Sequence, residues 1–246
     1  MSSGNVTLHP VYNFSLGMTK AVNKIIVALD VATNKEALGL VEQLRNQVSL
    51  FKVGLQLYTA EGPAVVREVI SRGAQVFLDL KLHDIPNTVA KAVEAAAGLG
   101  VEMLTIHLSG GPEMVRAAVA ADKEKMSILG VTVLTSANEQ TLRETGVPGA
   151  VEDQVLRLAK LGLEAGVDGI VASAREIEGL RRELGDKFKI VVPGIRPAGS
   201  DAADQKRTMT PREAINAGAD FLVIGRPIIA DKNPREALDR ILDELK

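Results

Sequence analysis

The residues best suited to chemistry lie in the ten-residue segment DLKLHDIPNT, residues 79–88. Asp79 and Lys81 are two positions apart in a run with the composition of a β-strand, so we expect both side chains to point to the same side. Asp84 follows the end of that run, where it is free to approach Lys81 or to cross a subunit interface. A lysine beside carboxylates stays protonated and can act as an acid. A purely structural cluster of ion pairs would have the same spacing, and this alternative stays open.

Other short apolar runs also end in polar or charged side chains. A charged group at such a position is costly to bury unless it is paired. Because there are so many of these residues, one shared polar site is a better explanation than a set of unrelated structural ion pairs. They are Asp30, Lys52, His107, Thr135, Ser136, Ser173, Arg196 and Arg226.

The elements that would position these residues are eight short runs rich in Val, Ile and Leu, separated by segments of helical period. This alternation is typical of βα units around a parallel sheet, and 246 residues suit eight such units in one domain. An open Rossmann sheet would need a glycine-rich turn after the first strand, and residues 31–34 (VATN) contain no glycine. We therefore predict the α/β class and a single (β/α)8 TIM barrel, with the polar residues at the carboxyl ends of its strands.

The predicted strands are residues 25–29, 50–53, 75–80, 103–107, 128–134, 169–172, 189–192 and 221–224. The clearest helical patterns cover residues 35–47, 63–71, 88–97, 112–121, 152–165 and 234–245. Alternation within the strand directs Leu80 and Leu82 toward the helices, opposite to Asp79 and Lys81. Residues 196–208 have the composition of a long mobile loop.

Composition bounds the possible partners and compartment. Hydrophobic residues make up 46% of the chain, so the protein can bury a large core. The net charge is only −2, so there is no strong electrostatic field to attract nucleic acid or an anionic membrane. The absence of cysteine excludes disulfides and thiolate metal sites, and fits a reducing cytoplasm. We expect residues 1–17 to be a disordered N-terminal extension or leader and residues 18–246 to form the barrel.

The ten-residue segment, with its D-x-K-x-x-D spacing followed by I-P-N-T, resembles the signature of the orotidine 5'-phosphate decarboxylase family. The similarity extends from Lys24 to Lys246, and five further motifs occur in family order. They are Leu29-Asp30, Phe51-Lys52-Val53-Gly54, Leu134-Thr135-Ser136, Val192-Pro193-Gly194-Ile195-Arg196-Pro197 and Ile224-Gly225-Arg226-Pro227. Together these motifs are far more specific than any one of them.

The resemblance implies decarboxylation of orotidine 5'-monophosphate to UMP and CO2 in de novo pyrimidine synthesis, with no cofactor and no metal. Lys81 would donate a proton to C6 of the pyrimidine, and Asp79 and Asp84 would be the other catalytic residues. The resemblance also implies a cytoplasmic homodimer with shared active sites, in which Asp84, Ile85 and Thr88 enter the partner's pocket.

The same resemblance assigns residues to each part of the nucleotide. Asp30 and Lys52 would hold the ribose hydroxyls, and Thr135 and Ser136 would contact the pyrimidine. Gly225 and Arg226 follow the eighth predicted strand, where barrels commonly bind phosphate. The complete set of implied substrate-binding residues is Asp30, Lys52, Ile85, Thr88, Thr135, Ser136, Pro193, Arg196, Gln205, Gly225 and Arg226.

Two other functions remain open. A Mg2+-dependent sugar-phosphate decarboxylase or aldolase of the same barrel superfamily shares D-x-K-x-x-D, but lacks the continuation at residues 83–88 and the Leu134-Thr135-Ser136 motif. A catalytically silent nucleotide-binding barrel would most simply have lost Asp79 or Lys81, and both are present. His83 and His107 lack ligand-spaced carboxylates, so we expect them to be packing residues and not metal ligands.

Overall fold

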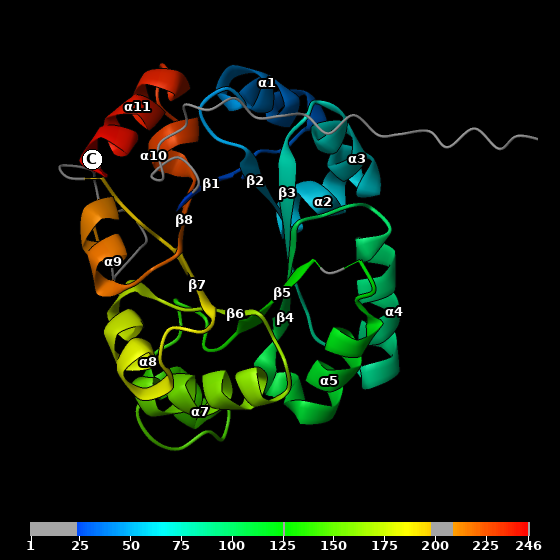
Figure 1. Cartoon of the computed structure of the whole chain (residues 1–246), viewed down its shortest axis with the longest axis vertical. Helices are drawn as coiled ribbons and strands as arrows, with labels where there is room; N and C mark the ends of the chain where they lie inside the picture. Colours follow the sequence, from blue (N-terminus) through cyan, green and yellow to red (C-terminus); the bar gives the residue numbers. More distant parts are fainter. Residues whose placement is uncertain (1–23, 125, 198–208, 246) are drawn as a thin grey trace, which may run out of the picture.

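A computed structural model describes residues 24–124, 126–197 and 209–245. Within these ranges eight parallel strands close into a barrel in chain order, and β8 pairs with β1 to complete it. Figure 1 shows the helices as an outer ring around the strands. The predicted single (β/α)8 TIM barrel is confirmed. The predicted extension at residues 1–17 and the implied substrate-binding residue Gln205 lie outside the described residues.

The strands are β1 (Ile25–Ala28), β2 (Leu50–Gly54), β3 (Gln75–Leu82), β4 (Met103–His107), β5 (Ser127–Val131), β6 (Gly169–Val171), β7 (Lys189–Pro193) and β8 (Phe221–Ile224). The helices are α1 (Asn34–Leu44), α2 (Leu55–Glu61), α3 (Pro63–Ser71), α4 (Pro86–Ala97), α5 (Gly111–Ala121), α6 (Glu139–Glu144), α7 (Val151–Glu164), α8 (Ile177–Leu184), α9 (Pro211–Ala217), α10 (Arg226–Ile229) and α11 (Pro234–Glu244). Short 3-10 turns, η2 (Leu108–Gly110) and η3 (Ala174–Glu176), follow β4 and precede α8.

The alternation of side chains along the strands creates two apolar cores. One fills the barrel interior, and the other lies between the strands and the ring of helices. Leu80 and Leu82 pack against the outer core, as the sequence predicts. The interior core comprises Ile26, Ala28, Leu50, Phe77, Met103, Leu129, Val191 and Val223. These side chains fill the middle of the barrel and leave the carboxyl ends of the strands for polar residues.

Local sequence fixes where several helices begin. Thr33 caps α1 in a capping box with Glu36, and Thr210 caps α9 in the same way with Glu213. Proline occupies the first turn of α3, α4, α5, α9, α10 and α11, where its missing N–H costs nothing. Gly218 ends α9 in the left-handed conformation, at φ 111°.

The fifth predicted strand is too long. The apolar run at residues 128–134 predicts a strand to Leu134, but β5 ends at Val131. Its neighbour β6 has three residues, and the last β5–β6 pair is Val131 with Val171, so no partner remains for the following residues. Thr135 and Ser136 consequently lie in the loop before α6 and not at a strand end.

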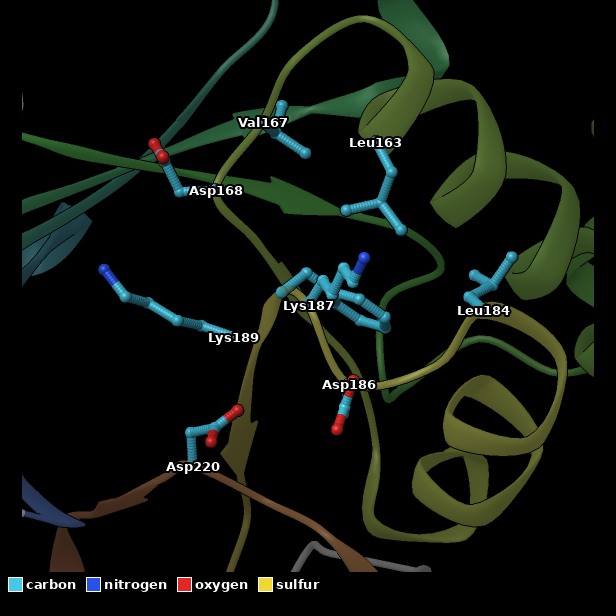
Figure 2. A pocket seen from close by; sticks show the side chains of 9 residues that line it. Leu163, Val167, Asp168, Leu184, Asp186, Lys187, Lys189 and Asp220 are labelled. Carbon is cyan, nitrogen blue, oxygen red and sulfur yellow. The ribbon is translucent and has the colours of Figure 1, made fainter.

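The opposite, amino-terminal end of the barrel carries a separate cavity of about 710 Å³. Figure 2 shows Asp168, Lys189 and Asp220 on one side of it and Leu163 and Leu184 on the other. Asp168 accepts a hydrogen bond from the backbone N–H of Ile128, and Asp220 accepts one from Ile190, so both carboxylates tie together the starts of neighbouring strands. In this fold such residues stabilise the barrel. None of the helices in the described ranges is long and apolar enough to cross a membrane.

Candidate active site

Four charged side chains form a continuous line across the carboxyl ends of β1, β2 and β3. Lys81 Nζ lies 2.7 Å from Asp79 Oδ1, and Lys52 Nζ lies 2.9 Å from Asp30 Oδ1. Lys52 Nζ is also 3.8 Å from Asp79 Oδ2, so it joins the two pairs. The positive and negative groups alternate, and each charge therefore stabilises its neighbours.

Exposure separates the roles available to these four residues. The side chains of Lys52 and Asp79 are 11% and 13% exposed, whereas that of Lys81 is 27% exposed. Lys81 is thus the more accessible cation, held against a largely buried carboxylate. This arrangement can present a fixed positive charge and a transferable proton to a bound molecule.

Two glycines leave room for the pair between Asp30 and Lys52. A Cβ at Gly54 would lie 2.8 Å from Lys52 Nζ, and one at Gly225 would lie 3.2 Å from Asp30 Oδ2. Any side chain at Gly54 would displace the ammonium group. The motifs Phe51-Lys52-Val53-Gly54 and Ile224-Gly225-Arg226-Pro227 therefore both shape the line of charges.

Lys81 reaches Asp79 through an irregular backbone. Its φ of 51° is the one positive φ among the non-glycine residues that the structure describes. The left-handed conformation costs a side-chain-bearing residue roughly 1–2 kcal/mol, so the neighbouring structure must hold it there. The side chains of Asp79 and Lys81 meet on the same side, as predicted, but their contact does not arise from regular strand alternation alone.

Thr105 on β4 is a polar neighbour of Asp79 and Lys81 that sequence reasoning missed. Its hydroxyl donates to Asp79 Oδ1 at 2.9 Å and accepts from the backbone N–H of Lys81 at 2.9 Å. Threonine is common in strands, and Thr105 lies within an apolar run instead of at its end. The available signal was the spacing Met103, Thr105, His107, which places a polar side chain on the inward face of β4.

The two histidines of the site pack against each other. The rings of His83 and His107 have centroids 5.5 Å apart. Burial lowers the pKa of the His107 imidazole, electrostatic interactions with His83 and Lys81 lower it further, and Asp79 opposes them. The lowered pKa favours the neutral imidazole, so His107 adds no positive charge to the line at neutral pH. Among residues 24–124, 126–197 and 209–245, no three His, Asp or Glu side chains are grouped to hold a metal ion.

Asp84, Ile85 and Thr88, in the second half of the ten-residue segment, are exposed to solvent. Asp84 is exposed and its Oδ1 accepts a hydrogen bond from the N–H of Ile85 at 2.7 Å. No ion pair links Asp84 to Lys81 within the described part of the chain. Ile85 is 66% exposed, and Thr88 is exposed in the first turn of α4. Within the described part of one chain these three residues are therefore exposed, and Asp84 is not ion-paired with Lys81.

The remaining expected substrate-binding residues surround the same end of the barrel. Pro193 ends β7, and the buried Arg196 follows it. The backbone N–H of Arg196 donates to the carbonyl of Met209 at 3.1 Å, which closes the base of the segment containing residues 198–208. Gly225 precedes α10, and Arg226 is the exposed first residue of that helix. Thr135 is half-buried and Ser136 is exposed.

Comparison with known proteins shows the family. The sequence model of the orotidine 5'-phosphate decarboxylase / HUMPS family matches residues 23–241. The chain belongs to this family. The family match spans all eight strands and every charged residue of the line from Asp30 to Lys81.

Individual members of the family are similar over nearly their whole length. Orotidine 5'-phosphate decarboxylase from Geobacter sp. (strain M21) is 50% identical over 233 residues, covering 92% of this chain and 97% of that protein. The enzyme of that name from Moorella thermoacetica is 51% identical over 235 residues, covering 92% and 93%. The crystal structure of orotidine 5'-phosphate decarboxylase from Lactobacillus acidophilus has a TM-score of 0.80 and 34% identity, covering 91% of this chain and 99% of that one. The resemblance found in the sequence is thus confirmed.

Proposed function

We propose that this protein decarboxylates orotidine 5'-monophosphate to UMP and CO2 in pyrimidine biosynthesis. The observation that carries the proposal is the Lys81 ammonium, fixed 2.7 Å from Asp79 and 27% exposed at the carboxyl end of a barrel of this family. The relatives named above, at about 50% identity, bear the name of this enzyme.

The proposed decarboxylation must stabilise the electron pair that is left on C6 of the pyrimidine. When the bond between C6 and the carboxylate carbon breaks, CO2 leaves and both bonding electrons remain on C6. The Lys81 ammonium stabilises that negative charge, then transfers a proton to C6 and becomes a neutral amine that recovers its proton from solvent. Asp79, placed beside the substrate carboxylate, disfavours two adjacent anions and is relieved when CO2 departs.

The rest of the nucleotide is bound by groups on the surrounding loops. Asp30 and Lys52, paired at 2.9 Å, are positioned at the end of β1 and on β2 to hold the ribose hydroxyls. Arg226 offers a guanidinium fork to the phosphate, beside the backbone of Gly225. Thr135 and Ser136 contact the pyrimidine. Pro193 and Arg196 are further proposed substrate-binding residues, and Gln205, outside the described residues, is a proposed phosphate ligand.

We further propose a homodimer with shared active sites. Asp84, Ile85 and Thr88 would enter the partner's pocket, where Asp84 adds a second carboxylate near Lys81. The exposure of Ile85 and the absence of an Asp84–Lys81 ion pair in the described part of one chain support this arrangement. A chain with no cysteine and a net charge of −2 also fits a cytoplasmic enzyme that binds neither nucleic acid nor membranes.

The proposal predicts conversion of orotidine 5'-monophosphate that survives exhaustive chelation, because Lys81 supplies the cation. Purified protein is dialysed against EDTA, and the loss of substrate absorbance and the formation of UMP are followed. The same preparation is given a ketogulonate phosphate and a hexulose phosphate, with and without Mg2+. Unchanged UMP formation in EDTA supports the proposal. Turnover of the sugar phosphates alone, strictly dependent on Mg2+, would refute it.

A further inference from the structure

The pairing between β3 and β4 slips at the catalytic segment. Leu78 pairs with Leu104, and the next pair is Leu82 with Ile106. Between these two pairs, β3 has three residues, 79–81, whereas β4 has one, Thr105. Residues 79–81 therefore form a bulge. Such bulges redirect side chains near active sites, and they also remove backbone groups from the regular ladder.

Thr105 lies between the two paired β4 residues, directly opposite this bulge. Its side chain is fully buried, with 0% exposure. The bulge leaves the N–H of Lys81 without a strand partner, and the Thr105 hydroxyl oxygen accepts its hydrogen bond at 2.9 Å. A buried backbone N–H needs such an acceptor, so the hydroxyl stabilises the left-handed conformation at φ 51°.

The same hydroxyl donates a hydrogen bond to the carboxylate of Asp79. It donates to Oδ1 at 2.9 Å, and this is the oxygen that the Lys81 ammonium contacts at 2.7 Å. Lys52 contacts the other oxygen, Oδ2, at 3.8 Å. Thr105 therefore holds the backbone of the lysine and the carboxylate of the aspartate at once. A hydroxyl can do both because it is a donor and an acceptor.

We propose that Thr105 is a positioning residue for decarboxylation: its hydroxyl fixes the bulge at Lys81 and the carboxylate of Asp79, and so sets the geometry of the catalytic pair. This inference rests on the proposed function and concerns how the site is preorganised. Thr105 acts through Asp79 and Lys81. It should therefore affect the chemical step more than substrate binding.

The test compares Thr105→Val, which keeps the shape and removes the hydroxyl, with Thr105→Ser, which keeps the hydroxyl. For Thr105→Val we expect kcat to fall at least about tenfold while KM stays within about threefold of wild type. Thr105→Ser should keep kcat within about threefold. If Thr105→Val does not fold, Thr105→Ala removes the same hydroxyl with less bulk, and the same kcat loss is expected. Circular dichroism and thermal melting verify folding of every variant.

Thr132→Val is the matched control. Thr132 is also a buried threonine, 4% exposed, and its hydroxyl donates to the carbonyl of Val171 and not to any of the four charged side chains. Its kcat should stay within about twofold of wild type. A folded Thr105→Val enzyme with wild-type kcat, or a Thr105→Ser enzyme as impaired as Thr105→Val, would refute the positioning role of Thr105. Neither result would affect the proposed function. An inactive wild-type enzyme would overturn the proposed function and this inference with it.

Discussion

Replacing Lys81 by alanine is expected to lower kcat for orotidine 5'-monophosphate at least about a thousandfold, equivalent to roughly 4 kcal/mol in the barrier. Under the proposed mechanism, the variant loses both the cation that stabilises charge on C6 and the proton that C6 receives. Alanine is no more strained than lysine at φ 51°, and the Lys81 side chain is partly exposed, so the fold should persist. Turnover is measured by substrate absorbance, and folding by circular dichroism and thermal melting.

Arg45→Ala provides a matched control for this substitution. Arg45 lies at the end of α1 and its guanidinium is 2.9 Å from Glu42, so its removal also breaks a short ion pair. The control should keep wild-type turnover because an exposed pair of this kind contributes little. A Lys81→Ala enzyme within tenfold of wild type, about 1.4 kcal/mol in barrier, would exclude the catalytic role of Lys81.

Mixing two inactive variants, Lys81→Ala and Asp84→Ala, is expected to restore activity. If Asp84 acts in the partner's site, each mixed dimer has one site carrying both defects and one site carrying neither. Random one-to-one mixing makes about half of the dimers mixed, so activity should approach a quarter of wild type. The variants are mixed under conditions of subunit exchange, and turnover is followed until it is constant.

Subunit exchange itself is verified with one variant carrying a mass-distinguishable tag. As a control, Lys81→Ala is mixed with a double variant that carries both substitutions. No chain in that mixture supplies Lys81, so it must stay inactive. If Asp84 acts within its own chain, every site in the first mixture has one defect. A mixture that stays inactive despite measured exchange would therefore contradict the shared site.

The sequence predicts the barrel well because the fold depends on repeated local patterns. The strands at residues 103–107 and 221–224 and the helix at residues 63–71 have the bounds that the structure shows. The predicted fifth strand is too long because its end depends on its neighbours β4 and β6, whose last pairs with β5 both involve Val131 and which lie about 24 and 40 residues away in the chain. Apolar composition cannot show where that partner stops.

Asp79 and Lys81 illustrate what spacing can and cannot establish. The positions of Asp79 and Lys81 correctly predict side chains that meet. Spacing does not show that the strand is bulged there, or that Lys81 is left-handed, because both depend on the register with β4. Sequence spacing does not single out Thr105 for the same reason, since its contacts with Asp79 and Lys81 depend on that register. The predicted role of Asp84 in the partner's site would likewise depend on a second chain, which spacing within one chain does not place.

The absence of cysteine allows the most direct test of the claim that an ammonium group at position 81 drives the reaction. Lys81→Cys introduces the only thiol of the chain, at a partly exposed side chain, and should be as inactive as Lys81→Ala. Treatment with 2-bromoethylamine forms a carbon–sulfur bond, releases bromide and rebuilds a side chain of nearly the same length with a terminal ammonium. Iodoacetamide, which adds a neutral group, is the control.

Modification is followed by mass spectrometry and turnover by substrate absorbance. The aminoethylated protein is expected to recover at least about a tenth of wild-type kcat, whereas the iodoacetamide-treated protein should stay inactive, because only the first restores the charge and the proton. A fully aminoethylated, folded protein that remains as inactive as Lys81→Cys would contradict the assignment of Lys81.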